Sequence, residues 1–509
     1  MQGTLLLERV AFAYGSSRPL FEHLNAHLNR GWTGVVGANG AGKTTLLRLL
    51  AGELEPTEGA IRMHPEDALI AVCPQHVGAL EEPVTDFAWR WDADAMKLKN
   101  ILGLSFEDVE RWAMLSPGER KRWQVGAALA RRPDVLLVDE PTNHLDAEAR
   151  ELVVDALATY SGVGVLVAHD RAVLDRLTTH TLWFERGSVR VWSESYSGAL
   201  EAWGTEQAGL RKAYAKLAER RGRAASAWRE QQNRRHGAER SYSRRMRDAG
   251  HKDHDARSMV TKGRGQSAIA THSRRQGVMG REVARLDEEL RAARLPKDLG
   301  RSITIEEAWC PKPRVCAMEL DVLQVGGRAL LREVKIAVGR TDRVHVRGAN
   351  GVGKTTLLRA ILEHMLVPPE RVLCIPQELT SADEVHLRHE LDGRTGEELG
   401  SVYGIAAALG AAPDILRASE SWSPGELRKM TIAAGLGRGA WAVVLDEPTN
   451  HLDLPSIERL EAALRAYQGA VIMVSHDAAF AASLTDVCWT LEEQRITVRR
   501  VQRAAPLTA

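Results

Sequence analysis

The chain has 509 residues, enough for two or three domains that each enclose a hydrophobic core. Its formal net charge is +1, and no apolar run approaches the roughly 20 residues that a membrane-spanning helix needs, so we expect a cytoplasmic protein without a membrane partner. Five cysteines lie scattered without a C-x-x-C pair, which argues against a zinc or disulfide framework.

The first strand-like stretch, residues 5–14, ends at Tyr14 just before a turn. An aromatic ring at this point can stack on an adenine base. It is about equally typical of a surface tyrosine at the end of a strand. Both interpretations of Tyr14 stay open from the residues alone.

Residues 37–44 have the spacing G-x-x-x-x-G-K-T, between a predicted strand at 32–36 and a predicted helix at 45–50. In such a loop the backbone N–H groups surround a phosphate chain, the lysine adds a positive charge, and the threonine hydroxyl is offered to Mg²⁺. The N-terminus of the following helix faces the anion. The candidate nucleotide-binding residues are Gly37, Asn39, Gly40, Gly42, Lys43, Thr44 and Thr45.

Two weaker patterns follow in the first half. A short apolar strand ends near Gln75, whose amide can reach Mg²⁺ and an attacking water, although a glutamine there is more often a solvated loop residue. Residues 116–119 read Ser-Pro-Gly-Glu before a helical run at 121–131. Ser116 and Gly118 at this helix N-terminus can form a second anion cradle, or the segment is simply a helix cap.

The continuous apolar run at 135–138 predicts a buried parallel strand that ends at Asp139 and Glu140. Ligands bind at the carboxyl ends of such strands, so Asp139 is placed to hold Mg²⁺ and Glu140 to activate water. A second buried strand at 163–168 ends at His169, which either contacts the γ-phosphate or serves a structural role.

Residues 211–280 differ from both flanks, because they hold 19 Lys+Arg and 6 Asp+Glu, a local charge of +13. Apolar residues recur at helical spacing at both ends and predict an antiparallel helical hairpin, whose tip we place at residues 248–271, where the periodicity is lost. Charge runs are usually solvated spacers, but this excess of one sign favours a phosphate-rich partner. The candidate RNA-binding residues are Arg244, Arg245, Arg247, Lys252, Arg257, Lys262 and Arg264.

The second half repeats the motifs of the first. The signature, acid pair and histidine return at an offset of 307 residues, and the phosphate loop returns at 311. The candidate residues of this half are Gly348, Asn350, Gly351, Gly353, Lys354, Thr355, Thr356, Gln377, Ser423, Gly425, Asp446, Glu447 and His476.

In this order, the motifs of each half resemble the nucleotide-binding domain of ABC ATPases. Two such domains in one chain, each with a Pro-Thr-Asn-His-Leu-Asp tail, resemble the ABC-F family. The resemblance implies an α/β fold of two ABC-type P-loop ATPase domains joined by an α-helical hairpin linker. The expected domains are residues 1–203, 204–303 (the linker) and 304–509.

The resemblance also implies a monomer whose halves close head-to-tail over two ATP molecules. Each phosphate loop would then face the other half's signature, so that Lys43 faces Ser423 and Gly425, and Lys354 faces Ser116 and Gly118. The catalytic residues would be Glu140, Glu447, His169 and His476. The Mg²⁺ ligands would be Thr44, Gln75, Asp139, Thr355, Gln377 and Asp446.

Three departures from the family pattern stand out. Pro117 and Pro424 replace the more usual glycine of the signature, and Trp422 replaces leucine. Residues 320–327 carry no aromatic equivalent of Tyr14, which makes adenine stacking doubtful at the second site. Both catalytic glutamates are present, so we expect two hydrolysis-competent sites of unequal quality.

The leading functional hypothesis is an ABC-F ATPase that binds the ribosome in its ATP-bound form and inserts the linker towards the P-site tRNA and the peptidyl-transferase centre. Hydrolysis would release it, and large-subunit rRNA would be a partner. A long linker without an inserted arm favours antibiotic-resistance ribosome protection. The alternatives are a housekeeping translation factor, the ATPase subunit of a membrane transporter, and a DNA-repair ATPase.

Overall fold

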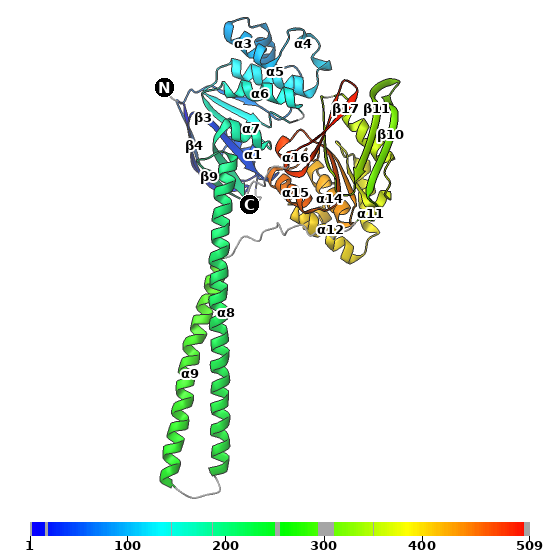
Figure 1. The fold of residues 1–509 in the computed structure, drawn as a ribbon. Helices are drawn as coiled ribbons and strands as arrows, with labels where there is room; N and C mark the ends of the chain where they lie inside the picture. The colour runs from blue at the N-terminus through cyan, green and yellow to red at the C-terminus, as the bar shows by residue number, and fades with distance from the viewer. Residues whose placement is uncertain are drawn as a thin grey trace. The chain divides into compact units, whose positions relative to one another are not determined.

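The computed structural model describes residues 3–15, 19–143, 145–185, 187–249, 255–293, 310–349 and 351–502 (Figure 1). The chain divides into two compact units. One combines Met1–Leu200 with Leu299–Ala509, and the other is Glu201–Asp298. Two candidate residues, Asn350 and Lys252, lie outside the described residues.

The first unit contains two six-stranded sheets of the same topology. The first has the strand order β5 (Ile70–Cys73), β6 (Val135–Asp139), β7 (Val163–Val167), β3 (Gly31–Gly37), β8 (Thr178–Glu185) and β9 (Ser188–Trp192). The second has the order β13 (Val372–Ile375), β14 (Ala442–Asp446), β15 (Ala470–Val474), β12 (Arg343–Arg347), β16 (Val487–Glu492) and β17 (Arg495–Arg500). In each sheet the last strand is antiparallel and the others are parallel.

The two acid-bearing strands, β6 and β14, are buried along their whole length. Continuous apolar sequence is what a strand covered on both faces requires, so the predicted α/β fold with two parallel sheets is confirmed. The strand order places β3 and β12, which lead into the phosphate loops, in the middle of their sheets beside β7 and β15. The loops, the acid pairs and the histidines therefore meet at one edge of each sheet.

Smaller antiparallel sheets accompany these. In the first half β1 (Thr4–Phe12) lies between β2 (Phe21–Leu28) and β4 (Glu58–His64), and in the second half β10 (Arg314–Val325) pairs with β11 (Arg328–Gly339).

Helices pack around the sheets. Those of the first half are α1 (Lys43–Leu50), α2 (Glu82–Trp89), α3 (Ala93–Leu102), α4 (Glu107–Glu110), α5 (Pro117–Ala130), α6 (Ala147–Ala158) and α7 (Arg171–Leu177). Those of the second half are α10 (Lys354–Glu363), α11 (Ser381–Asp392), α12 (Gly396–Ala408), α13 (Pro413–Ala418), α14 (Pro424–Gly437), α15 (Leu454–Ala466) and α16 (Ala478–Leu484).

The second unit is the predicted helical hairpin, made by α8 (Tyr196–Ala249) and α9 (Asp255–Ala292), the two long green helices of Figure 1. Three contacts join the two helices: Arg221 Nε to Asp287 Oδ1 at 2.8 Å, Gln231 Nε2 to His272 Nδ1 at 2.6 Å, and Arg235 Nη1 to Gln276 Oε1 at 3.0 Å.

The predicted extent of the hairpin tip is wrong, because Asp255–Thr271 is helical. Gly263 and Gly265 lower the helix propensity of this segment by about 1 kcal/mol each relative to alanine. Two unfavourable residues do not break a helix of 38 residues, because helix formation is cooperative and its nucleation cost is met once along the length. Among the described residues, no helix is both long and apolar enough to span a membrane.

Candidate nucleotide sites

The first phosphate loop connects β3 to α1 and depends on backbone conformations that only glycine adopts readily. Gly37 has φ +148°, and a Cβ built there would lie 2.7 Å from both Cβ and the carbonyl oxygen of Phe184. Gly42, the N-cap of α1, is left-handed with φ 104°. The Lys43 ammonium donates to the carbonyls of Gly37 at 2.9 Å and Ala38 at 3.0 Å, so it arches back over the loop.

The second loop has the same geometry. Gly353 caps α10 with φ 105°, and the Lys354 ammonium donates to the carbonyls of Gly348 at 2.8 Å and Ala349 at 3.0 Å. The described residues of the two loops therefore have matching geometry, as their matching sequences predict.

A hydroxyl and a carboxylate oxygen lie together in each half. Thr44 Oγ1 donates to Asp139 Oδ2 at 2.8 Å, and Thr355 Oγ1 donates to Asp446 Oδ2 at 2.7 Å. No cluster of three His, Cys, Asp or Glu side chains suited to a metal is found within the described residues. Few protein ligands, all of them oxygens, suit Mg²⁺, which is bound mainly through substrate phosphates and water.

The two candidate catalytic glutamates are buried at the ends of their strands. Both have positive φ, 47° for Glu140 and 48° for Glu447. Burial raises the pKa of Glu140 to about 8 and that of Glu447 to about 7. Each carboxylate therefore holds a proton more readily than an exposed glutamate does.

A histidine accompanies each glutamate, at a different distance. His169 Nε2 lies 3.0 Å from Glu140 Oε1, and burial lowers the pKa of this histidine to about 3, so its ring is neutral. In the second half, the backbone N–H of His476 donates to Glu447 Oε2 at 3.0 Å, and the ring Nε2 lies 3.4 Å from Oε1. The two sites have the same parts in slightly different arrangements.

The signature segments cap helices α5 and α14. Ser116 accepts from the backbone N–H of Glu119, and Ser423 accepts from that of Glu426, with the glutamate bonding back in each case. Pro117 and Pro424 occupy the first helical position, where a missing N–H leaves no helix hydrogen bond unmade. The unusual prolines are thus compatible with intact caps.

Trp422, another departure from the family pattern, is anchored in the core of the second half. Its backbone N–H donates to Glu384 Oε1 at 2.8 Å and its indole N–H to the carbonyl of Leu416 at 2.9 Å. The Arg388 guanidinium carbon lies 4.0 Å from the ring centroid. These contacts hold the residue before Ser423 in place.

A cavity of about 1120 Å³ brings the first phosphate loop to the second signature. Its described lining includes Lys43, Thr44, Asp139 and Glu140 together with Ser423 and Gly425. Direct contacts join the same segments: the backbone N–H of Asn39 donates to Asp453 Oδ2 at 2.9 Å, and its side-chain amide donates to the carbonyl of His451 at 3.3 Å.

The second phosphate loop lines the same cavity through Lys354, Thr355, Asp446 and Glu447. Ser116 and Gly118 are not among the described residues that line it. The described lining therefore contains the residues of the first expected pairing, and the second pairing stays a prediction.

The remaining candidates fall where their motifs place them. The described lining of the cavity also contains Tyr14, Asn39, Gly40, Gly42, Thr45, Gln75, His169, Gly351, Gly353, Thr356, Gln377 and His476. Tyr14 is half exposed, with its hydroxyl 3.3 Å from Thr45 Oγ1 and its ring edge-on to Phe12. At the second site Val325, Arg328 and Leu330 line the cavity on the β10–β11 hairpin.

The candidate RNA-binding residues other than Lys252 belong to the C-terminal part of α8 and the N-terminal part of α9. Arg244 is exposed on α8. The side chains of Arg245, Arg247, Arg257, Lys262 and Arg264, like residue Lys252, lie outside the described part of the structure. Their role as RNA contacts stays a prediction.

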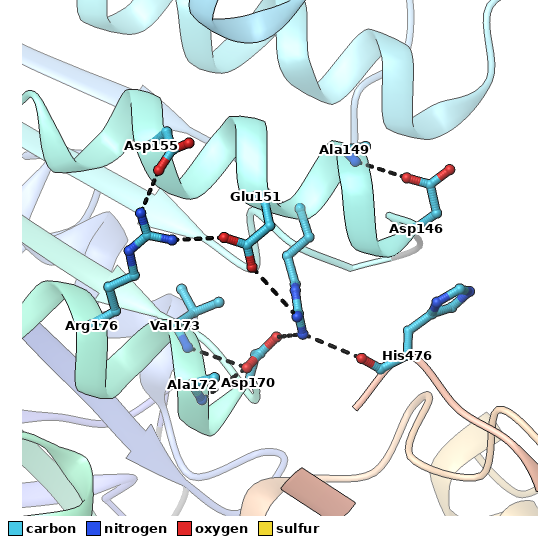
Figure 2. Close-up of polar contacts among 10 residues, drawn as sticks. Asp146, Ala149, Glu151, Asp155, Asp170, Ala172, Val173, Arg176 and His476 are labelled. Atoms are coloured by element: carbon cyan, nitrogen blue, oxygen red, sulfur yellow. Dashed lines mark hydrogen bonds and ion pairs between the residues drawn. The ribbon is translucent and has the colours of Figure 1, made fainter. Parts of the chain in front are cut away.

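Two arginines that no motif singled out join the halves. Arg150 Nη1 donates to Asp170 Oδ2 at 2.9 Å and to the backbone carbonyl of His476 at 3.3 Å. The labelled residues Asp170 and His476 lie near each other in Figure 2. Arg171 Nη1 donates to Glu461 Oε2 at 2.9 Å. Their partners in the second half lie 326 and 290 residues away in the sequence, so only the fold reveals them.

Two parallel-sheet halves, each with a phosphate loop, a capped signature and a strand-end acid pair, define an ABC-type ATPase with two nucleotide-binding halves in one chain. The profile of the ABC transporter family matches residues 21–143. The chain is 31% identical over 517 residues to the tylosin resistance ATP-binding protein TlrC of Streptomyces fradiae, which covers 87% of this chain and 89% of TlrC. It belongs to the ABC-F family and is an ATP hydrolase.

Other relatives extend the comparison. The chain is 27% identical to the ribosome protection protein VmlR of Bacillus subtilis, covering 92% of this chain and 83% of VmlR. It is 29% identical to the energy-dependent translational throttle protein EttA of Mycobacterium tuberculosis, covering 87% and 83%. A solved structure titled RNase-L Inhibitor has the same fold, with a TM-score of 0.59 at 18% identity, covering 96% of this chain and 90% of that one.

Proposed function

We propose that this ATPase binds the ribosome in its ATP-bound form, inserts its hairpin towards the P-site tRNA and the peptidyl-transferase centre, and is released on hydrolysis. The observation that carries the proposal is the +13 charge of residues 211–280, on a helical hairpin attached to a tandem ATPase. Such an excess of Lys and Arg suits the phosphates of large-subunit rRNA and tRNA.

The motif geometry supports one ATP at each phosphate loop of a monomer. Lys43, Thr44 and Asp139 would hold the first together with Ser423 and Gly425, which line the same cavity. Lys354, Thr355 and Asp446 would hold the second, with Ser116 and Gly118 joining on closure. Mg²⁺ supplies charge neutralisation on the phosphates when it is bound.

Glu140 and Glu447 would accept a proton from the attacking water, since each stands next to a candidate Mg²⁺ ligand at a strand end. His169 and His476 would each contact the γ-phosphate of the ATP in their site. Their rings lie within 3.4 Å of the two glutamate carboxylates. The side-chain amides of Gln75 and Gln377 would help to hold Mg²⁺ and the attacking water.

The biological role we propose is protection of ribosomes from antibiotics that bind the large subunit. Its support is that this chain is similar to TlrC and VmlR over most of their length. These two relatives are named for tylosin resistance and for ribosome protection. The relative EttA, named as a translational throttle, favours a second candidate, a regulator of translation.

The ATP-dependent step is tested with Glu140→Gln/Glu447→Gln, which should bind ATP without hydrolysing it. In sucrose gradients with ATP the double variant should sediment with ribosomes, and its expression should inhibit growth. Glu22→Gln/Glu363→Gln, which changes one exposed glutamate in each half, is the matched control and should behave like the wild type. A double variant that stays at the top of the gradient would remove the ribosome proposal.

The role of the hairpin is tested by drug susceptibility of a sensitive host. Expression should raise resistance to at least one large-subunit antibiotic, and deletion of residues 248–271 should abolish this. Replacing Arg244, Arg245 and Arg247 by glutamine should weaken the effect more than the same change at Arg211, Lys212 and Lys216, at the other end of α8. No shift for any drug, with intact ribosome binding, would favour the translation regulator.

A further inference from the structure

Arg150 lies on α6 between the two candidate catalytic centres. Its side chain is only 14% exposed, and one nitrogen, Nη1, serves both Asp170 of the first half and the His476 carbonyl of the second. A guanidinium holds such contacts in a fixed plane, which suits it to set the relative position of two groups.

On the second-half side, the contact leads directly to a candidate catalytic glutamate. Arg150 holds the carbonyl of His476, and the N–H of the same residue donates to Glu447 Oε2 at 3.0 Å. The orientation of His476 therefore decides where both its N–H and its ring lie against Glu447. A shift of Arg150 changes the geometry around that carboxylate.

On the first-half side, Asp170 follows His169, whose ring lies 3.0 Å from Glu140 Oε1. Asp170 is also the N-cap of α7, accepting from the backbone N–H groups of Ala172 and Val173, as Figure 2 shows. The aspartate is therefore held rigidly, and Arg150 transmits its position to the other half.

The position of the second half that corresponds to Arg150 does not carry a donor. The offset of 307 residues relates Arg150 to Ile457, on α15 of the second half. Ile457 is 2% exposed and packs in the apolar core of that half. An isoleucine side chain has no donor for the carbonyl of His169, so this position cannot make the reciprocal contact.

We propose that Arg150 is a positioning residue that makes hydrolysis at the Glu447 site depend on contact with the first half, whereas hydrolysis at the Glu140 site has no such dependence through Ile457. The proposal rests on the assignment of Glu140 and Glu447 in the proposed function. It predicts that the two sites respond differently to a single substitution.

The test is Arg150→Met in two backgrounds, each with one working site. With Glu140→Gln only the Glu447 site turns over, and Arg150→Met should lower its kcat by about 5- to 150-fold, the usual range of coupling between sites, with little change in KM. With Glu447→Gln the same substitution should change kcat less than twofold. Arg150→Lys should restore part of the loss, because its ammonium still donates.

The matched control is Arg176→Met, since Arg176 bonds only within the first half among the contacts seen here, to Glu151 and Asp155. It should leave both backgrounds unchanged. Thermal unfolding and titration with a fluorescent non-hydrolysable ATP analogue separate a folding or binding defect from a positioning effect: similar unfolding temperatures and analogue affinities support the proposal.

Equal losses in the two backgrounds, or none in either, would overturn the role of Arg150 while leaving the proposed function intact. Hydrolysis that survives Glu140→Gln and Glu447→Gln together would overturn the assignment of the glutamates, and the Arg150 proposal with it.

Discussion

The buried ion pair between Arg171 and Glu461 should be a main determinant of how firmly the two ATPase halves hold together. The two residues are 5% and 8% exposed. Although burial opposes the charge, Glu458 and Glu461 raise the pKa of Arg171 above its usual value. Removing one partner of a buried pair costs about 3–5 kcal/mol when the other charge is left without compensation. Because Arg465 Nη2 also donates to Glu461 Oε1 at 2.8 Å, we expect a loss near the lower end of this range.

The perturbation is Arg171→Met, which keeps the length of the side chain and removes the charge. For a cooperative unit of about 150–250 residues, a loss of this size lowers the unfolding temperature by roughly 6–20 °C. The matched control is Arg48→Met, whose ion pair with Glu53 is about half exposed and should be worth less than about 1 kcal/mol.

A double-mutant cycle tests the coupling of the two residues. Calorimetry gives the unfolding temperature and the stability of the wild type, of Arg171→Met, of Glu461→Leu and of the double variant. The double variant should lose less stability than the two single losses added together, because no unpaired partner is left. An unfolding temperature for Arg171→Met within 2 °C of the wild type, or strictly additive losses, would refute the reasoning.

Three further predictions concern single side chains. Gly37→Ala should weaken binding of a fluorescent ATP analogue at least about tenfold, since its Cβ would lie 2.7 Å from Phe184; an unchanged affinity would contradict this. Burial lowers the pKa of His345 to about 4, so between pH 4 and the unfolded value of about 6.5 the unfolded chain binds more protons. Stability should fall by about 2 kcal/mol through this group from pH 7 to pH 5, and His345→Gln should lack that part of the acid loss in urea unfolding. Trp422→Leu should cost about 1–3 kcal/mol through the lost stacking on Arg388, and urea unfolding at the wild-type midpoint would contradict it.

The sequence predicts those parts of the site that depend on local spacing. The phosphate loops, the strand-end acids and the capped signatures each require particular residues within a few positions of one another. Their short-range geometry is therefore visible before the fold is known: Ser116 and Glu119 form the expected cap, and Asp139 ends a fully buried strand.

Features that depend on distant contacts were not predictable. The partner of Arg150 lies 326 residues away, and nothing in the residues around Arg150 indicates a donor aimed at a second half. The helical state of residues 255–271 was missed for a different reason, since the glycines and the lost apolar periodicity are local signals, whereas helix formation is cooperative along the 38 residues of α9.

The duplicated motifs explain why the two sites share their chemistry, and the residues between the motifs explain why they need not share their control. Arg150 and Arg171 both reach from the first half into the second, while the positions related to them by the 307-residue offset, Ile457 and Ala478, cannot donate through their side chains. A symmetric pair of sites would respond equally to contact between the halves. If Arg150 positions His476 as proposed, movement of the first half should alter the surroundings of Glu447 more than movement of the second half, through Ile457, alters those of Glu140. Differences between the sites should therefore be sought in these cross-half arginines, rather than in the loops and acids that the halves have in common.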